Sequence, residues 1–479
     1  METPDQQQIN VIQQPVRLPC GLELTNRIVK VWAGDPSAHS PADSGNSAVV
    51  SPVVAGPIWI VDHWYVENVQ VCPRHLATPT DVAIPAGSEK EPVPTSWRAW
   101  AQICTVPTLV QLSHAGIQSP RGHGRALWDR PIGPSAIRLS LGNRLIDRLF
   151  AWAFFNHARE ASKDDILRIV EQFCSGAVFS HRAGFQGVQL HCSHGFLLSE
   201  FLSPKTNQRR DEYGMVATNR LRIVFQIIDA IRSSVPESFC LSIKLNSSDL
   251  SEGGLTQEEA LDNLRLIVTH GGIDMIEISG GTFENFRQKT NESAICSATS
   301  KDDVSPNSRP NEKKASEREA YYLDFTREAR RLLHAVSEET GQPCPILMTT
   351  GGFRSRSGMA LAISEQATDL IGIGRPACLD PLVSSKILDP NLLGYVCPNP
   401  AVPGVTMWKI LIPVKLVGAG FKTMWHTWQL HRMSRCQPPD LTCTALGSMR
   451  VVLPLDTILP TLAFSLFLIA VGFVVRPMF

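Results

Sequence analysis

The stretch AGFQGVQLHCSHGFLLSEFLSPKTNQRRDEYG, residues 183–214, decides the fold of this chain. Apolar and polar residues alternate from 187 to 191, as expected of a strand, and Ala-Gly at 183–184 ends the helix-like segment before it. The strand passes directly into a polar, basic loop, so His191 and His194 are expected at its carboxyl end. Barrel enzymes carry their catalytic groups at such strand ends.

Strand-like and helix-like segments alternate on both sides of this stretch. Helical spacing of apolar residues occurs at 164–181 and 219–232. This alternation predicts a parallel sheet of the α/β class, and eight units in one chain predict a (β/α)8 TIM barrel. The expected strands are 27–32, 108–112, 187–191, 239–245, 274–278, 345–349 and 370–373, with an eighth inside 56–71.

The composition of the chain limits its partners. The 479 residues contain 45 Lys and Arg against 45 Asp and Glu, so no overall field attracts nucleic acid, and we expect no nucleic-acid partner. Twelve cysteines occur without a C-x-x-C pair, which speaks against a zinc ribbon, an iron–sulfur cluster or a thioredoxin-like redox site.

Three regions are expected: a barrel domain at 1–395, a C-terminal helical extension at 396–450 and a hydrophobic segment at 457–475. The last segment, TILPTLAFSLFLIAVGFVV, has 19 uncharged residues, close to the roughly 20 that span a bilayer. It predicts a single-pass anchor, and the basic residues before it would keep the barrel in the cytosol, as in a tail-anchored protein of the endoplasmic reticulum. The alternatives are a buried core helix or a hydrophobic tail produced by a faulty gene model, with the protein then cytoplasmic.

Two stretches fit the barrel pattern poorly. Residues 290–314 are polar and lack periodicity, which predicts a long loop over the barrel mouth. Residues 35–55 are rich in Ser, Ala, Pro and Gly where a first helix is expected.

Eight segments, in order, resemble the old yellow enzyme family of FMN-dependent NAD(P)H oxidoreductases, in its branch of NADH:flavin oxidoreductases or NADH oxidases. They are LPCGLELTNRIVK (18–30), PTLVQLSHAG (107–116), HCSHGFLLSEFLSPKTNQRRDEYG (191–214), LSIKLNSSD (241–249), IEISGGTFE, SEREAYYLDF, TTGGFRSR and DLIGIGRP. The resemblance implies noncovalent FMN at the carboxyl ends of the strands, NAD(P)H as co-substrate and an α,β-unsaturated carbonyl compound as hydride acceptor. Fungal members are the most similar, which suggests a role in specialised metabolism.

The resemblance also assigns residues to the cofactor. Gly351, Gly352, Gly374 and Arg375 match the phosphate site, where small residues let backbone N–H groups approach an anion and arginine adds a bidentate donor. Gln111 matches the amide that bonds the flavin pyrimidine. Lys244 lies in an apolar strand, where an unpaired ammonium is costly, so it needs an anionic partner. By resemblance that partner is the N1–C2=O edge of the flavin, and a salt bridge inside the barrel is the alternative.

His191 and His194 match the pair that binds the substrate oxygen. Two N–H donors on one oxygen would polarise an enone so that its β-carbon accepts hydride. The H-x-x-H spacing could also hold a metal, but no third ligand follows at a suitable spacing, so we expect no metal there.

Two departures from the family pattern leave alternatives open. Phe196 stands where the family has a proton-donating tyrosine, which favours a redox-neutral flavin isomerase or desaturase as the alternative function. The unusual residues 31–34, with Trp32 where relatives have small residues under the flavin, favour a flavin-free, membrane-tethered binding or scaffold protein.

Overall fold

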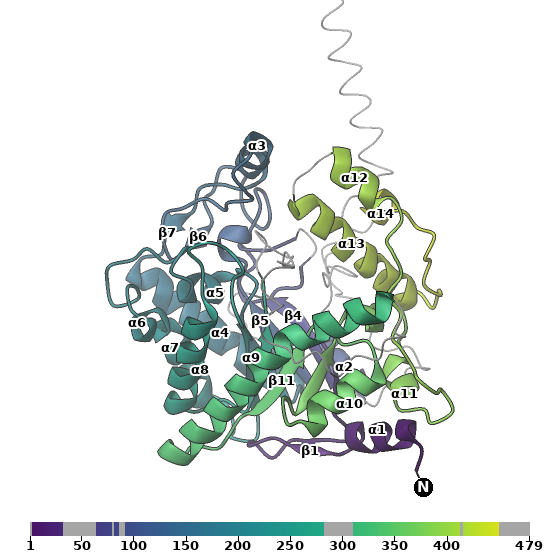
Figure 1. The fold of residues 1–479 in the computed structure, drawn as a ribbon. Coiled ribbons are helices and arrows are strands. Elements are labelled where there is room, and N and C mark those ends of the chain that lie inside the picture. Colours follow the sequence, from purple (N-terminus) through teal and green to yellow (C-terminus); the bar gives the residue numbers. More distant parts are fainter. Residues whose placement is uncertain are drawn as a thin grey trace, which may run out of the picture.

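Eight parallel strands form a closed barrel at the centre of the molecule (Figure 1). The computed structural model describes residues 2–31, 64–78, 81–85, 92–281, 310–411 and 415–449. The barrel predicted from the sequence is confirmed, with the eighth strand inside 56–71. The strands follow one another in chain order: β3 (Ile28–Lys30), β4 (Trp64–Gln70), β5 (Thr108–Ser113), β8 (Gly187–Cys192), β9 (Cys240–Asn246), β10 (Met275–Ser279), β11 (Ile346–Thr350) and β12 (Leu370–Ile373), which pairs back with β3.

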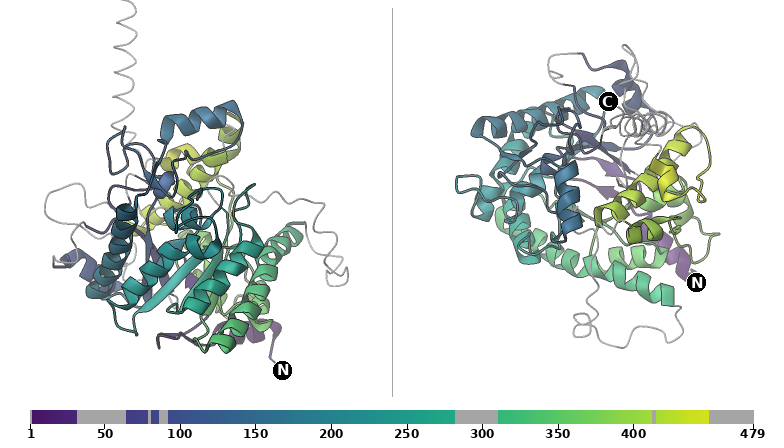
Figure 2. Two further views of the ribbon diagram at one scale, coloured as in Figure 1. Left: turned by 90° about the vertical axis from the view of Figure 1, so that its left-hand side faces the viewer. Right: turned by 90° about the horizontal axis from the view of Figure 1, so that it is seen from above.

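Helices surround the barrel (Figure 2). The predicted helix at 164–181 is present as α4, and the one at 219–232 is divided at Leu221 into α6 and α7. The helices between the strands are α2 (Thr95–Ile103), α4 (Lys163–Ala183), α5 (Leu197–Leu202), α6 (Ala217–Arg220), α7 (Arg222–Arg232), α8 (Gln257–His270), α9 (Pro310–Thr340) and α10 (Arg356–Ser364).

Helix α4 shows how the sequence sets these boundaries. Ser162 and Asp165 form a capping box at its start, which satisfies two backbone N–H groups that the helix leaves free. Gly184 ends the helix at φ 104°, a left-handed conformation that glycine adopts without steric cost. Between these ends, Ile166 and Phe173 are buried against the outer wall of the barrel.

The barrel interior has an apolar lower part and a polar upper part. Leu109, Met275, Met348 and Leu370 come from different strands and form one buried cluster, so these positions face inward. Because side chains alternate along a strand, positions two and four residues further along face inward as well. These positions hold polar residues, among them Gln111, and they build the candidate site.

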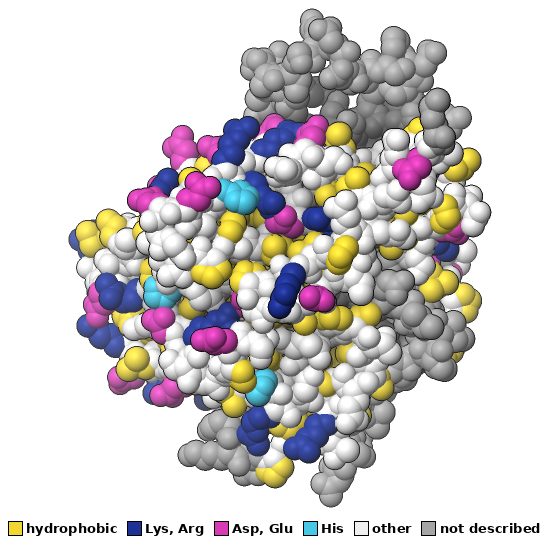
Figure 3. Space-filling view, turned by 90° about the horizontal axis from the view of Figure 1, so that it is seen from below, with side chains coloured by type: hydrophobic (Ala, Val, Ile, Leu, Met, Phe, Trp, Pro, Cys, Tyr) yellow, Lys and Arg dark blue, Asp and Glu magenta, His cyan; other side chains and the backbone are white. Residues whose placement is uncertain are grey.

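Short elements close both ends of the molecule. At the lower end are α1 (Pro4–Ile12) and a hairpin of β1 (Val16–Arg17) and β2 (Glu23–Leu24), and in the view of this face basic and acidic side chains are interspersed (Figure 3). The other short elements are η2 (Gly116–Gln118), β6 (Ile132–Gly133), α3 (Leu145–Phe154), β7 (Arg159–Glu160), η4 (Arg375–Cys378), α11 (Val383–Ile387), α12 (Val405–Leu411), α13 (Lys415–Ser434) and α14 (Ala445–Ser448). The last three lie together at the upper end, beside the barrel mouth (Figure 1).

Several expectations concern residues outside the described part. Trp32, the segment 35–55 and the hydrophobic segment 457–475 all lie there. Within the described part, no helix combines the length and the apolar character needed to span a membrane. The prediction of a loop across 290–314 is wrong at its end, because helix α9 already begins at Pro310.

Candidate active site at the barrel mouth

Strand register brings the predicted polar residues together above the apolar lower part of the barrel interior. Gln111 on β5 pairs with Gln189 on β8, and His191 on β8 pairs with Lys244 on β9. Lys244 in turn pairs with Glu277 on β10. All five side chains are buried, so each polar atom needs a partner in the protein or in a ligand.

The amide of Gln111 belongs to a hydrogen-bond chain across the barrel. Its Nε2 donates to Gln189 Oε1 at 2.5 Å, and Gln189 Nε2 donates to Ser242 Oγ at 3.2 Å and to Glu277 Oε2 at 3.0 Å. This chain fixes the orientation of the Gln111 amide and leaves its carbonyl oxygen for another donor.

Lys244 has its anionic partner inside the barrel. Its Nζ lies 2.9 Å from Glu277 Oε1, and both side chains are almost fully buried. The salt bridge that the sequence left open as an alternative is therefore present, and the charge of Lys244 is balanced before any ligand binds. Glu277 and Gln189 were not among the residues predicted from the sequence. The signal that revealed Lys244, a polar residue in an apolar strand, also marks both of these residues.

His191 is held as a neutral hydrogen-bond donor. The Ser193 N–H donates to its Nδ1 at 3.4 Å, so the proton of the neutral ring is on Nε2. Complete burial, with the nearby His194 and the positive Lys244, lowers the pKa of His191 well below its ordinary value. The ring also packs on Phe196, with 4.4 Å between ring centroids.

His194 occupies a strained turn beside His191. Its φ of 59° is left-handed, which costs free energy in a non-glycine residue. The backbone N–H of His194 donates to Asn246 Oδ1 at 3.2 Å, and Ser279 Oγ lies 2.9 Å from His194 Nε2. Burial, and secondarily Lys244, lowers the pKa of His194 to about 3, so this ring is neutral at pH 7 as well. The centroids of the two histidine rings lie 5.3 Å apart, and the rings are nearly perpendicular.

A buried acid follows Phe196 on the next helix, and the sequence analysis did not identify it. Glu200 on α5 is 1% exposed, and burial raises its pKa well above its ordinary value. Its Oε1 accepts the Ile117 N–H at 2.8 Å, and its Oε2 has no hydrogen-bond partner among the described residues. Glu200 and Gly195, the residue after His194, line the same small cavity of about 30 Å³. Burial therefore favours the protonated carboxylic acid form of Glu200.

The four predicted phosphate-site residues lie in two adjacent loops. Gly351 and Gly352 follow β11, with φ of 120° and 89°, conformations that glycine adopts readily. Gly374 and the exposed Arg375 follow β12, and the two strands pair with each other. The loops therefore lie side by side at the carboxyl end of the barrel.

The C-terminal segment brings further basic residues to these loops. Helix α13 packs against η4, where Arg375 lies. Burial, together with the positive charges of Arg375, Arg354 and Lys422, lowers the pKa of His426 on α13 to about 4. These three basic residues therefore act on one region beside the glycine loops, which is the electrostatic setting that a phosphate needs.

The residues of the mouth fit a flavin. Three inward-facing oxygen atoms, Gln111 Oε1, Ser113 Oγ and Thr350 Oγ1, are buried without a hydrogen-bond partner among the described residues. A planar ligand with polar edges would satisfy such atoms. A side chain at Gly372 would come within 2.0 Å of Thr350 Oγ1, so this glycine keeps the interior open at that level.

Comparison with known sequences shows which proteins this chain resembles. The sequence pattern of the NADH:flavin oxidoreductase / NADH oxidase family matches residues 105–390. The chain is 35% identical to the NADH-dependent flavin oxidoreductase iccE of Talaromyces variabilis, over 79% of this chain and 86% of that protein. It is 34% identical to the NADH-dependent flavin oxidoreductase iliE of Hypocrea jecorina, over 78% of this chain and 88% of that protein.

Solved structures show the same fold. An old yellow enzyme homologue from Zymomonas mobilis superposes with a TM-score of 0.58 and 18% identity, over 78% of this chain and 91% of that one. Morphinone reductase in complex with tetrahydroNAD superposes with a TM-score of 0.56 and 17% identity, over 80% and 93% of the two chains.

Proposed function

Because this chain belongs to the NADH:flavin oxidoreductase / NADH oxidase family and is an NAD(P)H-dependent flavin oxidoreductase that uses FMN, we propose that its second substrate is an α,β-unsaturated carbonyl compound. The observation that carries this proposal is the pair of neutral, buried histidines at the end of β8. When bound, FMN would accept hydride from NAD(P)H and supply it to the β-carbon of the substrate.

His191 and His194 would hold the carbonyl oxygen of the substrate. His191 would donate from Nε2, because Ser193 occupies its Nδ1. His194 Nε2 would exchange its present contact with Ser279 Oγ for the substrate oxygen. Both rings stay neutral across the physiological range, so they would polarise the carbonyl as N–H donors without changing charge.

The cofactor would be held by the residues that the sequence resemblance names. Gln111 would bond the pyrimidine edge through the carbonyl oxygen that the Gln189 chain leaves unpaired. Lys244 has donors beyond its bond to Glu277 and would place them at the same edge. Gly351, Gly352, Gly374 and Arg375 would hold the phosphate.

The proposal is tested by separating the two half-reactions. Protein lacking residues 457–479 is purified, its visible spectrum is recorded, and NADH or NADPH is added without oxygen. The flavin band should bleach, and 2-cyclohexenone should restore it at a rate that rises with enone concentration. Bleaching without recovery with any of a panel of enones would contradict the proposed substrate class.

We propose Glu200 as the group that stores the proton for the α-carbon, since Phe196 has none to donate. Support comes from its raised pKa, from its Oε2, unpaired among the described residues, and from the cavity that it shares with Gly195. Glu200→Gln should slow recovery by the enone about 10²-fold, the lower end of a general acid's contribution, and leave bleaching by NADH unchanged. Glu252→Gln, an exposed glutamate, is the control. Equal recovery rates in Glu200→Gln and in the control would eliminate Glu200.

Phe196 also favours the second candidate, a redox-neutral isomerase or desaturase. In that case Phe196→Tyr should increase net enone reduction by about 10²-fold, because tyrosine adds the missing acid. Substrate turnover without net NAD(P)H consumption in the unmodified protein would support this candidate over ene reduction.

We further propose that residues 457–475 anchor the protein in a membrane, with the barrel domain (1–395) and the helical extension (396–450) in the cytosol. The support is the uncharged sequence of that segment. The full chain should resist extraction from membranes by alkaline carbonate, whereas protein lacking 457–479 should be released. Release of the full chain would contradict the anchor, and its recovery in the supernatant before carbonate treatment would support the cytoplasmic alternative.

A further inference from the structure

A large cavity lies on the outer side of the barrel wall, away from the proposed flavin site. It has a volume of about 580 Å³, within the roughly 300–1,000 Å³ of small-molecule pockets. One wall is helix α4, through Ile169 and Gln172, and another is the end of β5, through His114. His114 is an odd number of positions from Gln111 on an extended segment, so the two side chains project to opposite sides of the barrel wall. We call this space the outer cavity.

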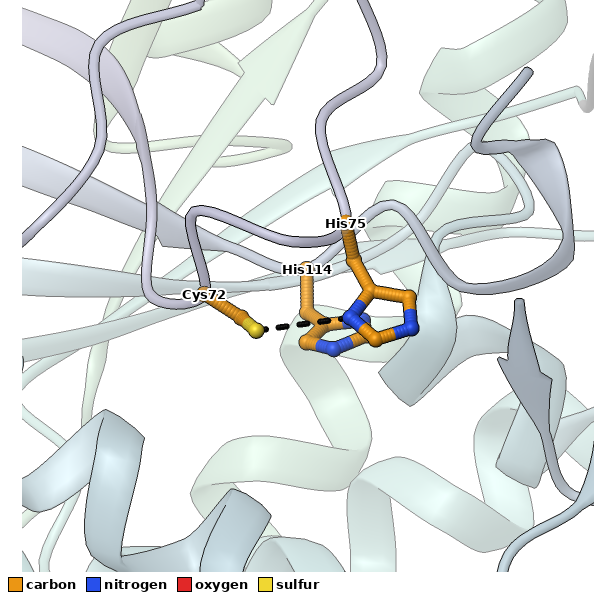
Figure 4. A group of neighbouring side chains, drawn as sticks. All are labelled: Cys72, His75 and His114. Carbon is orange, nitrogen blue, oxygen red and sulfur yellow. Dashed lines mark hydrogen bonds between the residues drawn. The ribbon is translucent and has the colours of Figure 1, made fainter. Parts of the chain in front are cut away.

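Cys72, His75 and His114 form one cluster in the outer cavity (Figure 4). Cys72 Sγ lies 3.3 Å from His75 Nδ1, and the two imidazole rings stack with 4.6 Å between centroids. All three residues are buried. Burial raises the pKa of the Cys72 thiol, so Cys72 contacts His75 as a neutral thiol.

Both histidines present their Nε2 atom to the outer cavity. The Gly116 N–H donates to His114 Nδ1 at 3.1 Å, so the ring proton of His114 is on Nε2. In His75 the Cys72 thiol occupies Nδ1, which leaves Nε2 for another partner. Neither Nε2 has a hydrogen-bond partner among the described residues, and both residues line the cavity.

The outer cavity is also strongly positive. Five arginines and two aspartates line it, an excess of three positive charges: Arg74, Arg125, Arg130, Arg159, Arg168, Asp129 and Asp165. Burial, and secondarily nearby positive charge such as that of Arg125, lowers the pKa of His75 to about 2 and that of His114 to about 3. The cavity thus combines positive charge with neutral N–H donors.

A metal ion fits this cluster less well than an anion does. Cysteine and two histidines are suitable ligands for zinc or copper, and their ligand atoms lie within 4.8 Å of one another. However, a metal-bound histidine normally donates its other N–H to an acceptor, whereas His114 accepts a bond from the Gly116 N–H. The surrounding arginines would also repel a cation.

We propose that the outer cavity is a second ligand site, which binds a small phosphate-bearing anion between the histidine pair and the arginines. The two Nε2–H groups would bond one phosphate oxygen. Arg74, whose side chain is 68% exposed and bonds Asp129 at 3.3 Å, would supply a planar fork of donors to the others. Trp128, 78% exposed at the rim, offers a flat surface for a ring attached to the phosphate.

The test is calorimetric titration of the full chain, saturated with FMN so that the flavin phosphate site is filled, with inorganic pyrophosphate. Arg74→Gln should weaken binding by about tenfold or more, as expected for the loss of a charge-assisted bond. His75→Phe, which keeps the ring stack but removes the N–H, should weaken it as well. Arg98→Gln removes the same charge from an exposed position on α2 outside the cavity and should bind like the unmodified protein. The FMN absorbance of each variant shows that it is folded.

A second titration, with ADP, separates the two sources of phosphate. Tighter binding of ADP than of pyrophosphate, lost in Trp128→Ala, would assign an organic phosphate, and equal binding would assign inorganic phosphate. Absence of pyrophosphate binding, or an equal loss in Arg98→Gln, would overturn the proposal. So would one equivalent of zinc retained in equilibrium dialysis by the unmodified protein and lost in Cys72→Ser, without pyrophosphate binding.

Discussion

The barrel mouth and the outer cavity each contain two buried histidines, but the balance of charged residues around each pair differs. In the mouth, the buried cation Lys244 beside the histidines is balanced by Glu277. In the outer cavity, arginines outnumber aspartates by five to two. The histidines are neutral in both places because burial is the dominant cause in each. Burial therefore determines the protonation state of a histidine, whereas the surrounding charges determine which kind of ligand it can bind.

The largest expected effect comes from breaking the charge pair in the mouth. Lys244→Met should lower the free energy of unfolding by about 3–5 kcal/mol, because Glu277 would remain buried and unpaired. Urea denaturation measures the change. The double variant Lys244→Met/Glu277→Gln should recover most of it, and a double variant as unstable as the single one would show that the pair is not the cause.

The next effect concerns catalysis. His191→Phe should lower the rate of enone reduction by about 10²–10³-fold, the loss seen when one donor to a developing oxyanion is removed. Reduction of the flavin by NADH should be affected much less, so the two half-reactions are measured separately by stopped-flow absorbance. His181→Phe, at an exposed position on α4, is the matched control. A loss confined to the NADH step would place His191 with the nicotinamide instead of the enone.

Acid stability tests whether the two histidine pairs are equally buried. Below pH 6.5 the unfolded histidines bind protons and the buried ones do not, so the free energy of unfolding falls as the pH falls from about 6.5 toward the lowered folded pKa values. Each histidine contributes a slope of up to about 1.4 kcal/mol per pH unit. His75→Phe and His194→Phe should each flatten the profile of chemical denaturation between pH 4 and 6.5. If only one variant flattens the profile, the other histidine binds protons equally in the folded and unfolded states, and its pKa is not lowered by folding.

The smallest effect is expected at the rim of the outer cavity. Arg74→Gln should change the free energy of unfolding by less than about 1 kcal/mol, because its bond to Asp129 is exposed to solvent. Urea denaturation of Arg74→Gln and of Lys244→Met, measured together, compares an exposed charge pair with a buried one. If Arg74→Gln lowers the free energy of unfolding as much as Lys244→Met does, Arg74 stabilises the fold and is not available to bind a ligand.

Much of the mouth could be predicted from the sequence because its chemistry follows strand periodicity. Lys244 stood out as a charge in an apolar strand, and His191 as the last residue of an alternating one. Glu277 carried the same signal, but its role as the partner of Lys244 depends on which strands are neighbours. Glu200 carried no local signal, because an acid on a short helix becomes unusual only when the fold buries it.

The sequence by itself determined the barrel, the order of its strands and the family, because alternating hydrophobicity and the quoted motifs are properties of neighbouring residues. Only the tertiary structure decided that Cys72, His75 and His114 meet, since strands β4 and β5 must pair before these residues approach one another. It also decided the charge states, because the pKa of a buried group depends on solvent exclusion and on charges from distant parts of the chain. Local pattern therefore specifies the scaffold, and packing specifies the electrostatics of the cavities that the scaffold encloses.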